Sequence, residues 1–412
     1  MNSHNHTDTR PSEERGQTLL MFVLFMLVLF LFVGLGIDIG FAYITKANLS
    51  KAVDAACLTG MRNLSQGTVT AGAMADSTFH ANYGAPGRDV AAISPTITFG
   101  FDPNNNRTLN VSATATINTF FIRVLPAWKT LQVSANAQTT RSKLVMSLVL
   151  DRSGSMGSNG GATALPGAVI GFVNNFDDVN DRVSMSSFSY AGRTDVALTQ
   201  PFKAPITTAV NNLSFAGWTA SEQGLTNGLV QNLSYTPAVT GGNTETVVRV
   251  MIFFTDGLAN TFKYTFNCGA RNIGPDRTLY DPITGNAAGG GCTIPNNIPS
   301  ISPPPANVST TSGCGPLTIE AQKRAVAIAR LAQQQGIIVF SIGLGDGSGP
   351  PECGFPPLNK GFLYQVANDP NPANPAYVSS LPSGEAVFAP NASDLANVFN
   401  QIAAKILLRI TQ

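Results

Sequence analysis

The chain has 412 residues, enough for two or three domains, of which 43% are hydrophobic and only 12% are charged. That charged share is about half of the usual value for globular proteins, so Ser, Thr, Asn and Gly supply the polar surface, a composition that favours an extracytoplasmic protein. The net charge of +1 gives no support to nucleic-acid binding, and we expect no nucleic-acid partner.

The first predicted element is a membrane-spanning helix. The run from Leu19 to Ile37 is nearly all Leu, Phe, Val and Met, carries no charge, and has the length of a membrane span. A cleavable signal peptide is the alternative, but the run is too long for a typical h-region and no small-x-small site closes it. We therefore expect an uncleaved, single-pass anchor.

The charges around this span do not settle its orientation, because Arg and Lys lie on both sides of it. The tail at residues 1–15 is short and polar, and we expect it to be disordered. The cysteines farther along favour an oxidising compartment. We therefore place the tail in the cytoplasm and the bulk of the chain on the far side of the membrane.

The span is predicted to continue as a helix without a breaker, so that residues 16–64 form the anchor and its extension. Apolar residues keep helical spacing from Ile37 to Leu64. Small side chains form one face of this extension, at Ala47, Ala52, Ala55 and Ala56. This face either packs on its own domain or makes a helix–helix contact within an assembly.

Residues 65–141 are predicted to form a small β region. The apolar period changes to two in three segments, Thr96–Phe101, Leu109–Ile117 and Leu131–Ala137. The cluster Asp102-Pro103-Asn104-Asn105-Asn106 is a turn between the first two segments. These segments predict a small antiparallel sheet, and a long helix packed on such a sheet is the shape of a pilin-like protein.

Residues 142–412 alternate between strand and helix patterns, which predicts an α/β domain. The expected strands are 145–150, 182–190, 247–254 and 337–343, and the expected helices are 162–175, 206–213, 222–233, 317–335 and 393–408. The strands are continuous apolar runs, so both faces of the sheet must be covered. We expect a mostly parallel, Rossmann-like sheet covered by helices.

Two stretches interrupt this alternation, at residues 261–316 and 345–382, and both are rich in Gly, Pro, Asn and Ser. We interpret them as surface insertions that carry specificity or, alternatively, have no partner. Four cysteines lie in or beside them without the Cys-x-x-Cys spacing of zinc sites: Cys268, Cys292, Cys314 and Cys353. Two disulfides are predicted, with three possible pairings, and Cys57 is left unpaired.

Polar side chains with cation-binding chemistry follow two of the predicted strands. Asp151, Ser153 and Ser155 come directly after the first strand, and Asp256 follows the strand that ends at Phe254. Thr219 lies in a loop just before a helix. The carboxyl ends of parallel strands meet at one edge of a sheet, so these five oxygen-bearing side chains are expected to converge there. Such ligands suit a hard divalent cation.

The segment from about residue 144 to 412 resembles a von Willebrand factor type A domain, whose metal-ion-dependent adhesion site uses Asp-x-Ser-x-Ser with a downstream Thr and a downstream Asp. The resemblance implies that Ser153 and Ser155 bind Mg²⁺, or Mn²⁺ or Ca²⁺, directly. Asp151, Asp256 and Thr219 would bind it directly or through water. An open coordination position would then accept a carboxylate from a protein partner.

Trp218, directly before Thr219, stands at a position where the family usually has a glycine. We leave two interpretations open, an aromatic partner contact beside the metal and a packed loop residue. No base or nucleophile is evident beside the predicted metal ligands. The domain is therefore expected not to be an enzyme.

The N-terminal segments Arg15-Gly16-Gln17-Thr18-Leu19 and Gly36-Ile37-Asp38-Ile39-Gly40, with Asn48–Gly60, resemble TadE/TadG-like proteins of bacterial tight-adherence pilus systems. The arrangement of anchor, β region and von Willebrand A domain is most similar to the TadG type. This resemblance implies a single-pass inner-membrane protein whose bulk is periplasmic or extracellular. Pilins cut by prepilin peptidase carry Glu five residues after the cleavage-site Gly, whereas Met21 stands there, so such processing is not expected.

Two functions follow from these resemblances. The first is a membrane-anchored, non-enzymatic component of tight-adherence (Flp, type IVb) pilus assembly or adhesion, which binds an acidic residue of another pilus or envelope protein through Mg²⁺. The alternative is a surface adhesin that binds host or matrix ligands through the metal site and the disulfide-pinned insertions.

Overall fold

The computed structural model describes residues 14–84, 91–124, 128–301, 307–311 and 314–411, with the side chains of residues 14–17 and 240 left aside. Most of the tail for which we expect disorder lies outside these residues. The chain divides into two compact units. The first comprises residues 1–63, 68–99 and 109–139, and the second comprises residues 64–67, 100–108 and 140–412.

The first unit is built on one long helix, α1 (Glu14–Arg62), which confirms the expected continuation of the apolar span. By length and composition, α1 is able to cross a membrane, and it exposes large apolar side chains from Leu19 to Val33. The later part of α1 contains buried side chains instead. Ala52 and Ala56 have no exposed surface, so this part of the small-residue face packs within its own unit.

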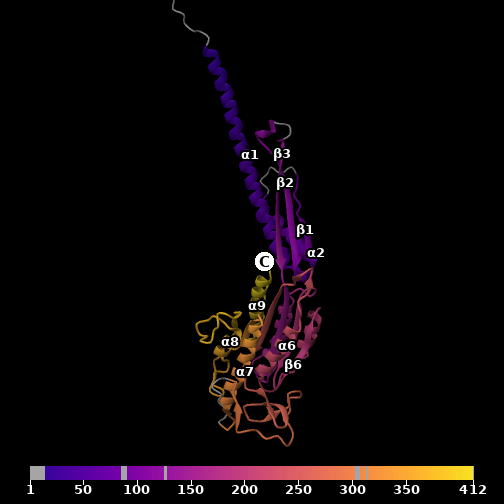
Figure 1. The fold of residues 1–412 in the computed structure, drawn as a ribbon, viewed down its shortest axis with the longest axis vertical. Coiled ribbons are helices and arrows are strands. Elements are labelled where there is room, and N and C mark those ends of the chain that lie inside the picture. The colour runs from indigo at the N-terminus through magenta and orange to yellow at the C-terminus, as the bar shows by residue number, and fades with distance from the viewer. Residues whose placement is uncertain (1–13, 85–90, 125–127, 302–306, 312–313, 412) are drawn as a thin grey trace, which may run out of the picture. The chain divides into compact units, whose positions relative to one another are not determined.

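Helix α2 (Thr68–Asn82) follows the short 3-10 turn η1 (Leu64–Gln66), and the sequence pattern did not predict it. Its buried residues Ala71, Ala75 and Phe79 are spaced by four and make one apolar stripe. The stripe is narrow and built mainly of alanine, so its periodic signal is weak. Helix α2 lies beside α1 (Figure 1).

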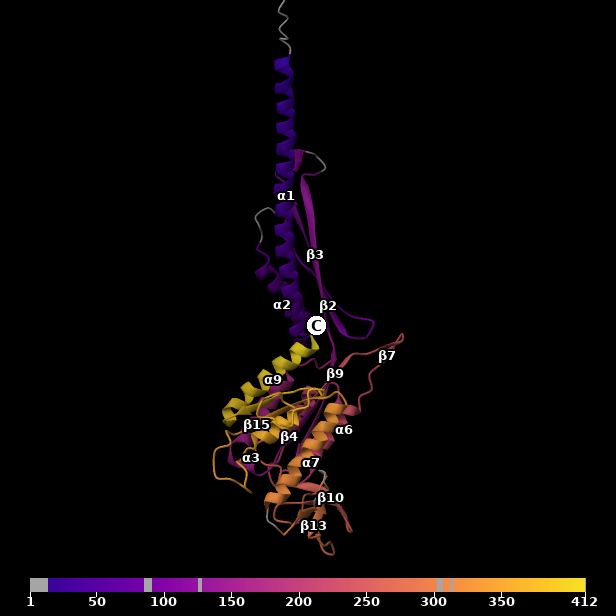
Figure 2. The same cartoon turned by 60° about the vertical axis from the view of Figure 1, so that its left-hand side comes forward.

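A three-stranded sheet completes the first unit, in the order β1 (Thr96–Phe101), β2 (Arg107–Asn118), β3 (Thr130–Arg141). Successive strands are joined by hairpins, so they run antiparallel as predicted. Strands β2 and β3 run beside α1 (Figure 2). Cys57 is free and buried, and its thiol donates a hydrogen bond to the carbonyl oxygen of Leu109 at 3.1 Å. Burial raises the pKa of this thiol to about 11.

The second unit contains the predicted α/β domain. Its six-stranded sheet has the order β16-β15-β9-β4-β5-β6. The strands are β4 (Lys143–Asp151), β5 (Arg182–Phe188), β6 (Gly192–Thr199), β9 (Val247–Thr255), β15 (Ile338–Leu344) and β16 (Ala386–Ala389). All neighbouring pairs are parallel except β5 and β6, so the expectation of a mostly parallel sheet is confirmed.

Helices cover both faces of this sheet. Helices α4 (Gly161–Val173), α5 (Lys203–Asn211) and α9 (Leu395–Ile410) contribute to one apolar core, with the short helix α3 (Ser155–Ser158) and the turn η4 (Ala392–Asp394) at its margin. Helices α6 (Ser221–Leu233), α7 (Cys314–Gln334) and α8 (Lys360–Ala367) contribute to the other core. Strand β4 serves both, because Leu148 and Leu150 enter the first core and Val149 the second.

The stretch at 261–316 is more ordered than a surface loop. It forms two small antiparallel sheets, one of β10 (Phe262–Phe266), β11 (Gly269–Ile273) and β12 (Leu279–Tyr280), the other of β13 (Asn297–Pro299) and β14 (Asn307–Ser309). Phe262, Ile273 and Ile298 are fully buried in the second core. These strands are two to five residues long, too short for a clear period-two pattern.

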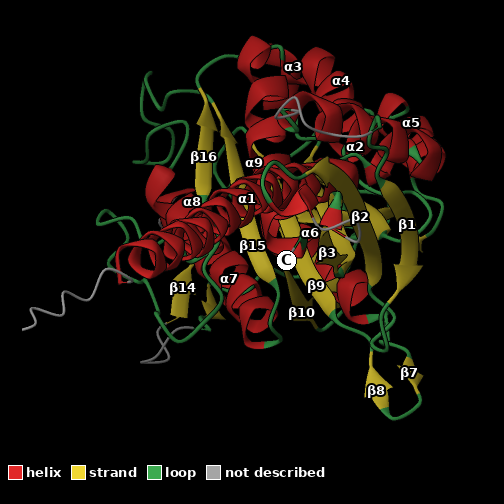
Figure 3. Cartoon of the chain, turned by 90° about the horizontal axis from the view of Figure 1, so that it is seen from above, coloured by secondary structure: helices red, strands yellow, loops and turns green. Residues whose placement is uncertain are grey.

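The stretch at 345–382 contains α8, which was not predicted. Leu363, Val366 and Ala367 of α8 are fully buried against the sheet, so this helix is the connection between the parallel strands β15 and β16. The prolines and glycines on either side of these eight residues hid the helical pattern. A further hairpin, of β7 (Val239–Thr240) and β8 (Asn243–Thr244), extends away from the sheet (Figure 3).

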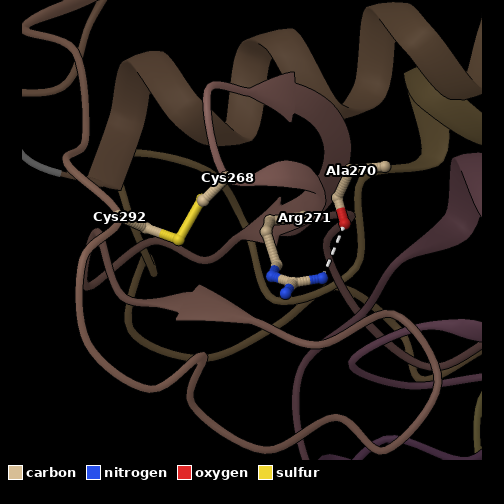
Figure 4. The surroundings of a disulfide bond; sticks show 4 residues. All are labelled: Cys268, Ala270, Arg271 and Cys292. Carbon is tan, nitrogen blue, oxygen red and sulfur yellow. Dashed lines mark hydrogen bonds between the residues drawn. A yellow bond between two sulfur atoms is a disulfide. The ribbon is translucent and has the colours of Figure 1, made fainter.

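Two disulfides select one of the three possible pairings. Cys268 bonds to Cys292 within the first stretch, beside strand β11 (Figure 4). In the same view, the guanidinium of Arg271 donates to the carbonyl oxygen of Ala270 at 3.2 Å. Cys314, at the start of α7, bonds to Cys353 in the second stretch. One disulfide therefore closes a loop within the first stretch, and the other joins the end of the first stretch to the second.

A buried ion pair lies within the second unit, close to the start of β4. Arg141 is 2% exposed and Asp181 is fully buried, and the guanidinium donates to both carboxylate oxygens of Asp181, at 2.8 and 2.6 Å. Asp181 also accepts hydrogen bonds from the backbone N–H groups of Leu144 and Asp177. One carboxylate thus fixes both the entry of β4 and the turn before β5.

Replacing Asp181 with Ala should lower the free energy of unfolding by about 3–5 kcal/mol, because it leaves a buried guanidinium without a partner. The matched control is Glu385→Ala, which removes the half-exposed ion pair with Lys405 and should change stability by less than about 1 kcal/mol. Urea unfolding of the detergent-solubilised chain, followed by near-ultraviolet circular dichroism, measures both. Equal effects of the two variants would contradict the prediction.

Candidate metal centre

Parallel pairing of β4 and β9 places the two predicted carboxylates side by side. Leu150 pairs with Phe254 in the register of the two strands, so Asp151 and Asp256 emerge at the same carboxyl edge of the sheet. The loop after β4 is held by backbone hydrogen bonds to the loop before α6. The N–H of Gly154 donates to the carbonyl oxygen of Gly217 at 3.1 Å, and the N–H of Ala216 donates to that of Arg152 at 3.0 Å.

Gly217 is required in this second loop for two reasons. Its φ of +88° lies in the left-handed region, and a Cβ there would come within 2.4 Å of the Tyr190 ring. The tight turn brings the next residues, Trp218 and Thr219, to the edge of the sheet. Thr219 is fixed there by Asn260, whose side-chain oxygen accepts its N–H at 2.7 Å and whose N–H donates to its carbonyl at 3.2 Å.

The structure brings four of the predicted ligands into one hydrogen-bonded cluster. The hydroxyl oxygens of Ser153 and Ser155 are 3.0 Å apart, and Asp256 Oδ1 accepts from Ser155 at 2.9 Å and from Ser153 at 3.5 Å. Asp151 lies beneath them, fully buried, and its Oδ1 accepts the N–H of Ser153 at 2.7 Å. The fifth predicted ligand, Thr219, lines the same cavity as Ser155 and Asp256, a volume of about 350 Å³.

The spacing of these oxygens fits a small divalent cation. Neighbouring oxygens around an octahedral Mg²⁺, each about 2.0–2.1 Å from the ion, lie about 3 Å apart. Two of the three distances among Ser153 Oγ, Ser155 Oγ and Asp256 Oδ1 match that value, and the third is 0.5 Å longer than the Ser153–Ser155 distance of 3.0 Å. The described residues contain no group of three or more His, Cys, Asp or Glu side chains able to hold a metal, so a cation in this cluster would take part of its donor set from hydroxyls.

Three further residues orient these ligands and were not predicted. The Thr255 hydroxyl donates to Asp151 Oδ2 at 2.6 Å, and the Asn159 amide donates to Asp256 Oδ2 at 2.6 Å. Asn260 holds Thr219 as described above. Thr255 stands next to Asp256 in sequence, which was an available signal. Asn159 and Asn260 lie in loops where nothing in the sequence pattern distinguishes them from other asparagines.

The two carboxylates have raised pKa values. Burial, and then the negative charge of Asp256, raises the pKa of Asp151 to about 7. Burial raises the pKa of Asp256 as well. Among the ion pairs of the described residues, none involves either carboxylate. A cation between them would remove both the desolvation cost and the mutual repulsion.

One disulfide-held stretch lines the cavity directly, and the other supports a residue that lines it. Trp218 lines the cavity, and its indole N–H donates to the hydroxyl of Tyr280 in the first stretch at 2.7 Å. Glu352 and Pro357 of the second stretch are lining residues themselves. Trp218 is thus held by packing and also faces the cavity, so neither earlier interpretation is excluded. The charged residues among the described lining are Asp256 and Glu352, both acidic.

Two segments of the chain match family models. Residues 16–63 match the model described as "Putative Flp pilus-assembly TadE/G-like", and residues 146–268 match the von Willebrand factor type A domain. The chain combines a TadE/G-like N-terminal region with a von Willebrand factor type A domain. The site formed by Asp151, Ser153, Ser155, Thr219 and Asp256 lies at the sheet edge of this von Willebrand A domain.

Solved structures with a similar fold include three pilus proteins. The pilus adhesin SpaC from Lactobacillus rhamnosus GG is 17% identical, with 80% of this chain and 36% of that chain covered and a TM-score of 0.44. The von Willebrand domain of the type V pili tip protein Mfa5 from Porphyromonas gingivalis is 16% identical (66% and 97% covered, TM-score 0.43). The PilB minor pilin from Streptococcus sanguinis is 13% identical (77% and 79%, TM-score 0.41). The comparison with curated proteins found no match.

The metal-free domain should lose stability as the pH rises from about 4 to about 7. The pKa of Asp151 is about 3.9 in an unfolded chain and about 7 in the folded one. Unfolding therefore releases its proton over that range, and the stability present below the unfolded pKa is lost as the pH approaches the folded value. Thermal unfolding in EDTA at a series of pH values should show a melting temperature that falls by several degrees.

Asp151→Asn is the matched variant, because it keeps the shape of the side chain and cannot ionise. Its melting temperature should vary less with pH over the same range. If the variant and the parent chain show the same pH profile in EDTA, the raised pKa of Asp151 is not the cause.

Proposed function

We propose that this chain is a membrane-anchored, non-enzymatic component of tight-adherence pilus assembly or adhesion, and that it binds a carboxylate of a protein partner through a divalent cation. The observation that carries the proposal is the cluster of Ser153, Ser155 and Asp256 oxygens above the buried Asp151, at the mouth of an acidic cavity. The TadE/G-like match of residues 16–63 supports the pilus context and the apolar helix α1 supports the anchor.

The charge of the site favours a metal bridge over direct binding of an acidic partner. Asp256 and Glu352 line the cavity, and no cationic side chain is among the described residues that line it. Without a cation, a partner carboxylate would meet only negative charge. A bound Mg²⁺ supplies the positive charge and an open coordination position. The protein provides few charged ligands, which leaves that charge incompletely neutralised for the partner.

The residues of the proposed site have different roles. Ser155 lines the cavity, its hydroxyl oxygen lies 3.0 Å from that of Ser153, and Asp256 is fixed between Ser155 and Asn159. Asp151 is held from below by Thr255 and by the backbone of Ser153. Thr219 stands on the opposite loop, where Asn260 holds it in place. A preorganised donor set of this kind binds the cation without first reorganising the loops.

The disulfide-held stretches are proposed to select the partner. Trp218, tied to Tyr280, lines the cavity together with Glu352 and Pro357. A partner segment that enters the cavity therefore meets an aromatic ring and an acidic side chain. The same rim would serve the alternative function, an adhesin for host or matrix ligands, and the identity of the captured protein separates the two.

Ser155→Ala should weaken Mg²⁺ or Mn²⁺ binding by about tenfold or more, because it removes an exposed oxygen from the cluster. The matched control is Ser158→Ala, since Ser158 lines the same cavity but lies outside the motif. Isothermal titration calorimetry of the chain in nanodiscs measures the affinity. If the two variants bind the cation with equal affinity, the cation is not bound by Ser155.

Asp151→Ala should abolish the retention of envelope proteins by the immobilised chain, and EDTA should do the same to the parent chain. The proteins retained in Mg²⁺ and released by EDTA are identified by mass spectrometry. Other pilus components support the assembly function, whereas host or matrix proteins support the adhesin. If neither EDTA nor Asp151→Ala reduces the retention, the metal-bridged interaction is contradicted.

A further inference from the structure

The loop between β2 and β3 is fastened to the apolar helix α1. We call the described part of this loop, residues 119–124 and 128–129, the hairpin tip; it includes the 3-10 turn η2 (Ile122–Val124). Asp38 of α1 is 3% exposed, and its carboxylate accepts three consecutive backbone N–H groups of the tip. The donors are Phe120 at 2.7 Å, Phe121 at 2.9 Å and Ile122 at 3.0 Å. Hydrogen bonds to an ionised acceptor are the strong ones.

Gly34, one helical turn before Asp38, lets the tip approach the helix closely. A Cβ at Gly34 would lie 2.4 Å from the Cβ of Phe121, so any larger residue would displace the tip. Gly34 and Asp38 lie on the same face of α1. The two residues lie four positions apart in the sequence, at the end of the apolar run, and both act on the same loop.

The tip nevertheless exposes a large apolar surface. Phe120 is 60% exposed, Phe121 48%, Val124 82% and Trp128 51%. Beside them is a cavity of about 320 Å³, and the described residues that line it are all apolar: Val28, Leu31, Phe32, Leu35, Ile122 and Trp128. Exposed apolar surface of this kind marks a place where a protein or a membrane is bound.

The position of the tip along α1 points to lipid. The apolar run ends at Ile37, and the cavity joins the tip to residues 28–35 of that run. At about 1.5 Å per residue, the distance from position 28 to position 37 is about 14 Å, close to half the hydrocarbon thickness of a bilayer. If α1 spans the membrane, the tip therefore lies beside its second half, at the depth of one leaflet.

The polar groups of the tip are arranged as a lipid environment requires. Backbone N–H and C=O groups in the hydrocarbon region must be satisfied internally. Asp38 satisfies three of the N–H groups. Thr119 satisfies further backbone groups of the tip. Its hydroxyl donates to the carbonyl oxygen of Trp128 at 2.7 Å, and its own N–H donates to the carbonyl oxygen of Lys129 at 3.1 Å. Arg123 and Lys129 are exposed, and their long side chains suit contact with lipid phosphates.

We propose that the hairpin tip is a second membrane contact of this chain, inserted into the same leaflet as the C-terminal half of the α1 span. Phe120, Phe121, Val124 and Trp128 contact acyl chains and the headgroup boundary. The inference rests on the proposed membrane anchor. A second contact on one side of α1 fixes the rotation of the helix about its axis, which a single apolar helix does not fix.

The chain offers a direct probe, because Trp128 and Trp218 are its only tryptophans. The full chain carrying Trp218→Phe is reconstituted in vesicles of phosphatidylcholine and phosphatidylglycerol with brominated acyl chains. The fluorescence of Trp128 should be quenched by about twofold or more relative to unbrominated vesicles, as for an interfacial tryptophan. The control is Trp128→Phe, in which only Trp218 beside the metal site emits and no quenching is expected.

Flotation of the vesicles separates this inference from the proposed anchor. If the chain floats with the vesicles and resists carbonate extraction but Trp128 is not quenched, the tip inference fails and the anchor stands. If the chain does not float, the anchor itself fails. A Trp128 emission that depends on the protein-to-lipid ratio and not on bromine would show that a second copy of the chain covers the tip, which also overturns the inference.

Asp38→Ala tests how the tip is placed, because it removes the acceptor of three N–H groups. It should reduce the quenching of Trp128 by about half or more, since the freed N–H groups then favour water. Asp54→Ala, on the exposed side of the same helix, is the matched control and should leave the quenching unchanged. Unaltered quenching in Asp38→Ala would overturn the role of Asp38 in holding the tip.

Discussion

Parallel pairing of β4 with β9 is the constraint on which the α/β domain depends. It aligns two strands whose alternate side chains enter different cores, so that Leu148 and Leu150 pack on one side of the sheet and Val149 on the other. The same register brings Asp151 and Asp256 to one edge, where both are nearly excluded from water. The apolar cores thus hold together two carboxylates whose ionised forms are disfavoured by burial.

The protein uses carboxylates in three different ways, and their partners distinguish them. Asp181 is buried against a guanidinium and serves the stability of the fold. Asp38 is buried against three backbone N–H groups and fastens a loop to an apolar helix. Asp151 and Asp256 receive only hydroxyl, amide and backbone donors, with no positive side chain. In this last arrangement, no ion pair among the described residues balances the charge of either carboxylate.

The two disulfide-held stretches connect the fold to the site. The first contributes Phe262, Ile273 and Ile298 to the core and reaches the cavity through the contact between Tyr280 and Trp218. The second contributes helix α8 to the sheet and Glu352 to the rim. Each stretch is therefore anchored in the core at one place and supports or lines the cavity at another.

The sequence by itself determined the long apolar helix, the antiparallel β region, the alternating α/β pattern and the five oxygen-bearing residues of the site. These are local signals: a charge-free run, a period of two or of about four, and hydroxyls spaced by two after a buried strand. It did not reveal α2, α8 or the short strands of the 261–316 stretch, whose patterns are too brief or too rich in alanine, proline and glycine. Only the tertiary structure decided the disulfide pairing, the support of the site by Asn159, Thr255 and Asn260, and the capture of the hairpin tip by Asp38. Each of these joins residues far apart in the chain, and such contacts are specified by the register and packing of the whole fold rather than by any local pattern.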